Sequence, residues 1–167
     1  GAARYRLGAP VYDMLSGERL VYRQGRAALV ELLDLRLGQR VLLVGCGTGL
    51  DFPFLAPAVG AQGSVVGVDR CRAMMRRAEA KTRRAAWSQV QLIVDDAESL
   101  TRVDGTFDAV LFTYSLSVID DWHSAWAAAV SRLRPGGKVG VLDTALPTGN
   151  GWPLRPLAKL AMWAGGV

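Results

Sequence analysis

Short apolar runs alternate with helical patterns along most of this chain. Five runs have the length and composition of strands buried on both faces, at 41–44, 64–69, 90–94, 107–113 and 138–143. Helical patterns at 26–37, 71–86 and 121–134 lie before or between them. Because strands that alternate with helices form parallel β-α-β units, the pattern predicts a single α/β domain with an open, doubly wound, mainly parallel sheet.

The helical pattern at 121–134 is the cleanest of the three. Its apolar residues recur at i, i+3 and i+4 spacing as one stripe: Trp122, Ala125, Trp126, Ala129, Val130 and Leu133. Asp120 or Asp121 can cap its start, and Arg-Pro-Gly-Gly at 134–137 is expected to end it. Beyond the fifth strand, prolines and glycines at 147–156 predict a loop, and a short helix is expected at 157–164.

The composition fits one globular domain and disfavours several protein classes. The chain has 167 residues, of which 50% are hydrophobic, enough for a packed core. Its two cysteines, Cys46 and Cys71, lack paired-ligand spacing, so we expect neither a disulfide framework nor a metal site. No apolar run reaches the ~18 residues that span a bilayer, and residues 1–6 lack the apolar region of a signal peptide. These features predict a cytoplasmic protein, with the apolar tail at 157–167 as a core helix or an interfacial segment.

The positive charge is concentrated in one segment. Between positions 70 and 84 the chain carries seven basic residues and one acid, a charge of +6, whereas the rest holds 13 basic and 14 acidic residues. This segment is either a solvated helix face or a surface for anionic lipid or nucleic acid, and the sequence leaves both open.

A glycine-rich turn follows the first predicted strand. Gly45, Gly47 and Gly49 would let a ligand approach the backbone, and the next helix can direct its N–H groups at an anion. A dinucleotide fingerprint would place its third glycine at position 50, where this chain has Leu50, so the pattern is moderately specific by itself. In a sheet of this type, ligands bind outside the carboxyl ends of the strands.

Acidic residues end the second and third predicted strands. Asp69 can accept hydrogen bonds from both hydroxyls of a ribose, as the acid of a dinucleotide site does, or it can cap the helix at 71–86. The two roles are compatible. Asp95 and Asp96 offer a carboxylate to an exocyclic amine such as that of adenine, or serve as turn acids.

Together these segments resemble the class I S-adenosylmethionine-dependent methyltransferases. The similar segments are VLLVGCGTGLDFPFL at 41–55, VVGVDRCRAMM at 65–75, VDDAESL at 94–100, FDAVLFTYSLSVIDDW at 107–122 and RLRPGGKVGVLD at 132–143. The resemblance implies a Rossmann-like sheet in the strand order 3-2-1-4-5. It also implies S-adenosylmethionine as the cofactor, with S-adenosylhomocysteine as the product.

The same resemblance implies roles for single residues. The glycines of the first turn would line the methionine end of the cofactor, and Asp69 would hold its ribose. Asp96 and Ala97 would flank the adenine, while Phe112 and Thr113 would close the site from the fourth strand. The full implied cofactor-binding set is Tyr12, Gly45, Cys46, Gly47, Gly49, Asp69, Arg70, Asp96, Ala97, Phe112 and Thr113.

A finer resemblance concerns the acceptor. RYRLGAPVYDMLSGERLVYRQGR at 4–26, GTGLDFPFL at 47–55 and YSLSVIDDW at 114–122 are similar to bacterial lipid-amine methyltransferases, such as phosphatidylethanolamine N-methyltransferases and betaine-lipid headgroup enzymes. It implies a helical lid at 1–37, with Tyr12 folded over the cofactor, and a small-molecule or lipid amine as the acceptor. With the basic segment, it suggests peripheral contact with an anionic membrane.

Two features depart from the family pattern. The family usually has an acid two residues before the first glycine, which helps to orient the amino end of the cofactor, but this chain has Leu43. The family also closes its sheet with an antiparallel strand pair after the fifth strand. The 24 residues after Asp143 are expected to be too few for that pair.

The sequence names no catalytic residue. Methyl transfer displaces an activated sulfonium and needs mainly alignment and desolvation, so a missing acid–base pair does not argue against it. Tyr114, Asp120 and Asp143 are candidates to contact a cationic amine, although each can equally cap a helix or satisfy a loop. The single histidine, His123, is expected to face solvent.

Two other functions remain open from the sequence. The residues after the fourth strand contain no N-P-P-Y-type run, which argues against methylation of base amino groups in nucleic acid. Other RNA acceptors stay open because of the basic segment. Leu43 keeps open a module that binds the cofactor without catalysis.

Overall fold

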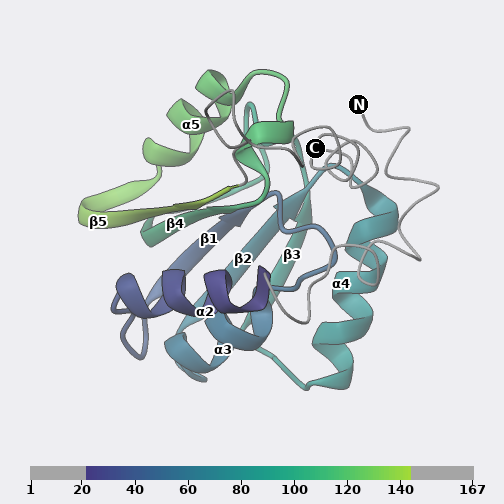
Figure 1. Ribbon diagram of the computed structural model, residues 1–167, viewed down its shortest axis with the longest axis vertical. Coiled ribbons are helices and arrows are strands. Elements are labelled where there is room, and N and C mark those ends of the chain that lie inside the picture. Colours follow the sequence, from purple (N-terminus) through teal and green to yellow (C-terminus); the bar gives the residue numbers. More distant parts are fainter. Residues whose placement is uncertain (1–21, 144–167) are drawn as a thin grey trace, which may run out of the picture.

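Each predicted apolar run forms a strand, and helices connect the strands except between β3 and β4, where residues 95–106 form turns. The computed structural model describes residues 22–143 (Figure 1). Along the chain the elements are α2 (Tyr22–Leu32), β1 (Arg40–Val44), α3 (Phe52–Val59), β2 (Ser64–Asp69), α4 (Arg72–Arg84), β3 (Val90–Val94), β4 (Phe107–Thr113), the 3-10 helix η1 (Leu116–Val118), α5 (Trp122–Val130) and β5 (Leu133–Leu142). Tyr12, most of the expected lid, and the expected loop and helix after position 143 lie outside the described residues.

The described strands form one five-stranded sheet in the order β3-β2-β1-β4-β5. All four neighbouring pairs are parallel. The predicted doubly wound α/β fold and its strand order are therefore confirmed. β1 lies at the centre, with β2 on one side and β4 on the other, so its carboxyl end is surrounded by the ends of its neighbours.

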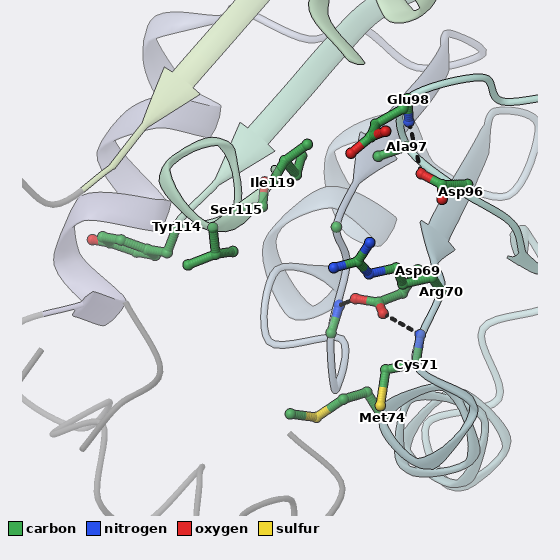
Figure 2. A pocket seen from close by; sticks show the side chains of 13 residues that line it. Asp69, Arg70, Cys71, Met74, Asp96, Ala97, Glu98, Tyr114, Ser115 and Ile119 are labelled. Carbon is green, nitrogen blue, oxygen red and sulfur yellow. Dashed lines mark hydrogen bonds between the residues drawn. The ribbon is translucent and has the colours of Figure 1, made fainter. Parts of the chain in front are cut away.

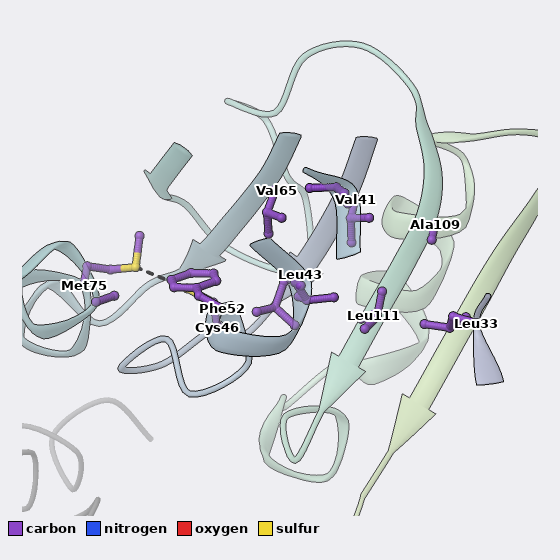
Figure 3. Packing of buried hydrophobic residues seen from close by; sticks show 12 residues of the cluster. Leu33, Val41, Leu43, Cys46, Phe52, Val65, Met75, Ala109 and Leu111 are labelled. Atoms are coloured by element: carbon purple, nitrogen blue, oxygen red, sulfur yellow. Dashed lines mark hydrogen bonds between the residues drawn. The ribbon is translucent and has the colours of Figure 1, made fainter. Parts of the chain in front are cut away.

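Helices cover both faces of the sheet, which explains the continuous apolar runs. Val41 and Leu43 of β1 point into a core beneath α3 and α4, together with Phe52 (Figure 3). The alternate residues Leu42 and Val44 belong to a second core, which includes Ala129 of α5. The helices α2, α3 and α4 thus lie on one face and α5 on the other (Figure 1).

The largest differences from the predicted element boundaries concern α2, α5 and β5. Helix α2 ends at Leu32, five residues early, and Asp34 just beyond it adopts a left-handed conformation with φ 44°. Helix α5 ends at Val130, before the Pro-Gly-Gly run that was expected to end it. Strand β5 instead begins at Leu133, opposite Phe107, and its register is irregular until Lys138 pairs with Ala109. The run at 134–137 therefore interrupts the strand pairing rather than ending a helix.

The apolar stripe predicted for α5 is only partly buried. Ala125 and Ala129 are fully buried, but Trp122 is 45% exposed and Trp126 is 37% exposed. The helix is short, so Ala125 and Ala129 are its only fully buried residues, while Trp126 stacks on Phe112 of β4 with ring centroids 6.0 Å apart and keeps one side exposed. Asp121 is the cap of this helix, since its carboxylate accepts a hydrogen bond from the Ser124 N–H at 3.1 Å.

Substituting Gly49 should destabilise the fold more than substituting a glycine in open space. Gly49 has φ +77°, and a Cβ there would lie 2.5 Å from the buried Phe52 ring. Gly38 has φ +86° with nothing within 4 Å of that position. Gly38→Ala should cost only the left-handed strain of about 1–2 kcal/mol, and Gly49→Ala should add roughly 1–3 kcal/mol of overpacking.

Urea denaturation of both variants measures this difference in the free energy of unfolding. Equal losses for Gly38→Ala and Gly49→Ala would show that the contact with Phe52 is not a constraint.

Candidate functional site

A pocket opens where β1, β2, β3 and β4 end (Figure 2). Its walls come from the loops that follow these four strands and from the first turn of α4. The lining residues are Gly45, Gly47, Asp69, Arg70, Cys71, Met74, Asp96, Ala97, Glu98, Tyr114, Ser115, Val118 and Ile119. Tyr114 and Ser115 lie on the side opposite Asp96 and Glu98, with Asp69 and Arg70 between them (Figure 2).

The glycine-rich turn after β1 forms the floor of the pocket. The Gly45 and Cys46 N–H groups both donate to the carbonyl oxygen of Val68 in β2, at 2.8 and 2.9 Å. Gly45 has φ +73°, and a Cβ there would lie 2.5 Å from the Ser115 Cβ. Gly47 has φ +53° with no atom within 4 Å of that position. Glycine at 45 therefore permits close strand packing, and glycine at 47 leaves open space beside the backbone.

Asp69 connects this turn to helix α4. Its Oδ2 accepts a hydrogen bond from the Gly47 N–H at 2.9 Å, and its Oδ1 accepts one from the Cys71 N–H at 2.7 Å. Burial raises the pKa of Asp69, while these two hydrogen bonds and the Arg70 charge oppose the rise. Each carboxylate oxygen has a second lone pair, so Asp69 can still accept from a ligand's hydroxyls. Because Cys71 is the N-cap residue of α4, Asp69 supports the start of the helix without being its cap, and its role in binding a ligand stays a prediction.

The two acids after β3 have different surroundings. Asp95 is buried, and its carboxylate accepts hydrogen bonds from the N–H groups of Asp96 at 2.9 Å and Arg102 at 2.7 Å. Asp96 lines the pocket and uses one oxygen to accept from the Glu98 N–H at 3.0 Å. Asp95 is therefore a turn acid, and Asp96 is the one that can meet a ligand.

Tyr114 and Ser115 form the opposite wall. Tyr114 has φ +52°, which is unfavourable for a side chain of this size. Its N–H donates to the Leu142 carbonyl at 2.6 Å. The Arg26 guanidinium lies over its ring, with Cζ 4.8 Å from the ring centroid. The Ser115 hydroxyl donates to the Val44 carbonyl at 2.8 Å. These contacts fix the end of β4 against the end of β1.

A buried ion pair lies behind this wall. Arg26 of α2 is 6% exposed and Asp51, just before α3, is 4% exposed; Arg26 Nε lies 3.2 Å from Asp51 Oδ1. Leu43, which stands where the family has an acid, is fully buried in the core. The carboxylate closest in sequence to the glycine-rich turn is thus that of Asp51, and it is balanced by Arg26.

The structure brings together six of the sequence-implied site residues: Gly45, Gly47, Asp69, Arg70, Asp96 and Ala97. Cys46 and Gly49 do not line the pocket. The Cys46 sulfur lies 3.5 Å from that of Met75, and burial raises the pKa of its thiol well above the ordinary value. Phe112 and Thr113 are buried in β4 rather than exposed to the pocket, because the chain turns into it only at Tyr114.

Six lining residues were not among the sequence candidates: Cys71, Met74, Glu98, Ser115, Val118 and Ile119. Glu98 and Ser115 closely follow strand ends, which is the signal that could have found them. Of the amine-contact candidates, Tyr114 lines the pocket. Asp120 lies 3.2 Å from Arg70, and Asp143 accepts hydrogen bonds from the Ser117 N–H and hydroxyl. His123 is exposed and stacks on Trp122.

The sequence of this chain is similar to those of known proteins. A family model described as "Methyltransferase domain" matches residues 41–137. Demethylmenaquinone methyltransferase of Bacillus cereus is 33% identical over 127 residues, 76% of this chain and 54% of that protein, so the chain spans about half the length of the curated relatives it matches.

Solved structures share the fold. The [4+2]-cyclase SpnF superposes with a TM-score of 0.74 at 24% identity, covering 99% of this chain and 70% of that one. An S-adenosylmethionine-dependent methyltransferase from Aquifex aeolicus gives a TM-score of 0.68 at 17% identity, covering 93% and 87% of the two chains.

The affinity for S-adenosylhomocysteine should depend on ionised Asp69. Replacing Asp69 with Asn removes charge-assisted hydrogen bonds worth ~1.5–3 kcal/mol, so roughly a tenfold or greater loss of affinity is expected. In the wild type, affinity should be constant above the pKa of Asp69 and fall as the pH drops through it. Because burial raises that pKa, the fall should begin at a higher pH than for an ordinary aspartate.

Calorimetric titrations at several pH values measure both effects. The Asp69→Asn variant is the control, and its residual affinity should lack this pH dependence. Unchanged affinity in the variant would remove Asp69 from the binding site.

Proposed function

The chain belongs to the methyltransferase domain family of class I, S-adenosylmethionine-dependent enzymes, and we propose that it transfers a methyl group to a small-molecule acceptor without a cationic centre. The observation that carries the proposal is the pocket at the strand ends, where Asp69, Asp96 and the glycine-rich turn converge. When bound, the cofactor supplies an activated methyl group on a sulfonium.

The residues of the pocket match the parts of that cofactor. Asp69 would hold the ribose hydroxyls, and the Asp96 carboxylate would accept from the adenine amine, with Ala97 beside it. The open space at Gly47 admits a ligand against the backbone. Tyr114 and Ser115 lie on the opposite side of the pocket (Figure 2), which on this placement would face the methionine end and the approaching acceptor. Alignment and exclusion of water are the tasks left to the chain.

The distribution of charge favours a neutral or anionic acceptor. The carboxylates that line the described pocket, Asp69, Asp96 and Glu98, all belong to its adenosine side. At the other side the Arg26 guanidinium lies against the Tyr114 ring. Asp51 balances that charge, and the described lining residues on this side, Tyr114, Ser115, Val118 and Ile119, carry no carboxylate that could pair with a cationic acceptor. A reduced quinone carries hydroxyl groups and no cationic centre, and the demethylmenaquinone methyltransferase relatives make it the first acceptor to test.

A lipid amine is the second candidate. The sequence resemblance at 4–26 and 114–122 supports it, and an amine can lose its proton before it enters the site. The apolar side chains of Val118 and Ile119 in the pocket wall are compatible with either acceptor.

Radiolabelled methyl transfer should distinguish these acceptors. We expect label in reduced demethylmenaquinone analogues and little in phosphatidylethanolamine vesicles, because the described residues on the acceptor side of the pocket offer no carboxylate to an ammonium. RNA is included as a third acceptor. The Asp69→Asn variant is the control for transfer that depends on the site. Label in phosphatidylethanolamine alone would replace the quinone with the lipid amine. Cofactor binding with no transfer to any acceptor would favour a binding module.

Helix α4 offers a surface for an anionic membrane. Arg72, Arg76, Arg83 and Arg84 are exposed on it, whereas the Lys81 ammonium lies 3.2 Å from the Thr48 hydroxyl. In the described part of the chain, no helix is long and apolar enough to cross a bilayer. Basic side chains near an anionic leaflet contribute about 1 kcal/mol each and are screened by salt, so several of them would give reversible docking.

Neutralising one of these arginines should weaken vesicle binding. Arg76→Gln is expected to lower the affinity for anionic vesicles about fivefold at low salt, the equivalent of about 1 kcal/mol. Arg36→Gln is the matched control. It removes another exposed arginine, which lies in the loop before β1 and pairs with Asp34. Equal sedimentation with anionic and neutral vesicles, or equal effects of the two variants, would reject the membrane surface. Competition by RNA alone would assign the surface to nucleic acid.

A further inference from the structure

The segment between β4 and α5 crosses the pocket. Val118 and Ile119 line it, and the two residues that follow reach its far rim. The Asp120 carboxylate lies 3.2 Å from the guanidinium of Arg70, which follows β2. The Asp121 N–H donates to Oε1 of Glu98, which follows β3, at 3.1 Å. Residues 118–121 therefore connect the β4 side of the pocket with the side that Asp69 and Asp96 occupy.

The two ends of this segment are held differently. At its beginning, the buried Ser115 hydroxyl donates to the Val44 carbonyl at 2.8 Å, and the Ser117 N–H and hydroxyl donate to Asp143 at 2.8 and 2.7 Å. At its far end, the side chains of Arg70 and Asp120 are 39% and 73% exposed. Exposed ion pairs contribute little to stability, because water screens them and ordering the side chains costs entropy. The near end is thus anchored to the sheet, and the far end is held by weak contacts that can open.

The Arg70 guanidinium lies beside the Asp69 carboxylate inside the pocket (Figure 2). Its charge favours the ionised form of Asp69. Asp120 therefore acts on the pocket through the Arg70 side chain, which it orients. Glu98 acts through its hydrogen bond with the backbone N–H of Asp121.

We propose that Asp120 and Glu98 are positioning residues that hold residues 118–121 across the adenosine side of the pocket. Val118 and Ile119 then pack on the bound nucleoside, and Arg70 stays next to the ribose-binding carboxylate. This inference rests on the proposed placement of adenosine at Asp69 and Asp96. It assigns release of S-adenosylhomocysteine to the opening of the two outer contacts.

Dissociation of S-adenosylhomocysteine from the purified chain, followed by stopped flow, tests the ion pair. Asp120→Asn should speed dissociation about two- to fivefold at low salt and less at high salt. In a double-mutant cycle, Asp120→Asn should add little once Arg70 has been replaced by Gln, because Asp120 acts through the Arg70 side chain. Asp34→Asn, which removes an exposed carboxylate paired with Arg36 away from the pocket, should leave the rate unchanged.

The Glu98 contact is tested by a conservative pair of variants. Glu98→Ala should speed dissociation, while Glu98→Gln should restore the slow rate because its amide oxygen can still accept from the Asp121 N–H. The Glu98→Ala effect should persist at high salt, because the lost partner is a neutral N–H.

Three results would overturn the inference. The first is additive effects of Asp120→Asn and Arg70→Gln, and the second is an Asp120→Asn rate equal to that of Asp34→Asn. The third is a fall in the melting temperature of the ligand-free variants that parallels the rate change, which would make the contacts merely structural. Failure of the proposed site looks different, since Asp69→Asn would then leave the affinity for S-adenosylhomocysteine unchanged.

Discussion

The Asp69 carboxylate joins the two backbone segments from which the pocket is built. It accepts one hydrogen bond from the turn after β1, through Gly47, and one from the start of α4, through Cys71. β1 and β2 are parallel neighbours at the centre of the sheet, so both segments leave it at the same edge. Without a shared acceptor, the two N–H groups in this partly buried region would need other partners, and an unpaired buried donor costs about 1–3 kcal/mol. The same carboxylate that completes the fold is therefore presented to the pocket.

Close packing of the backbone sets the other side of the pocket. Gly45 and Ser115 approach so closely that no side chain fits at position 45. The Ser115 hydroxyl bonds the last carbonyl of β1, while Tyr114 adopts positive φ to turn out of β4. The pocket wall thus depends on two central strands that end at the same level.

Charges are separated around the pocket in a way that suits methyl transfer. Acids lie on the side of the pocket that we propose for adenosine, the exposed arginines of α4 lie outside it, and the buried Arg26 and Asp51 neutralise each other behind Tyr114. A reaction with an activated leaving group needs an oriented, desolvated site more than a strong acid or base. The pocket has polar groups where a nucleoside needs recognition and mainly apolar or aromatic ones elsewhere.

The five strands and the places of Gly45, Asp69 and Asp96 at strand ends could be predicted from the sequence pattern. The order of the strands could be predicted from the family resemblance. The strands and the residues at their ends follow from local patterns. A strand buried on both faces shows as a continuous run of apolar residues, and the first polar residue after the run marks its end. Other features became clear only from the folded chain. Asp95 binds its own loop, and Phe112 and Thr113 are buried in the core. Trp122 and Trp126 are partly exposed. Arg70 and Asp120, 50 residues apart, meet across the pocket. The direction of a side chain at a strand end, and the depth to which a short helix is buried, depend on elements distant in sequence, and no local periodicity records them.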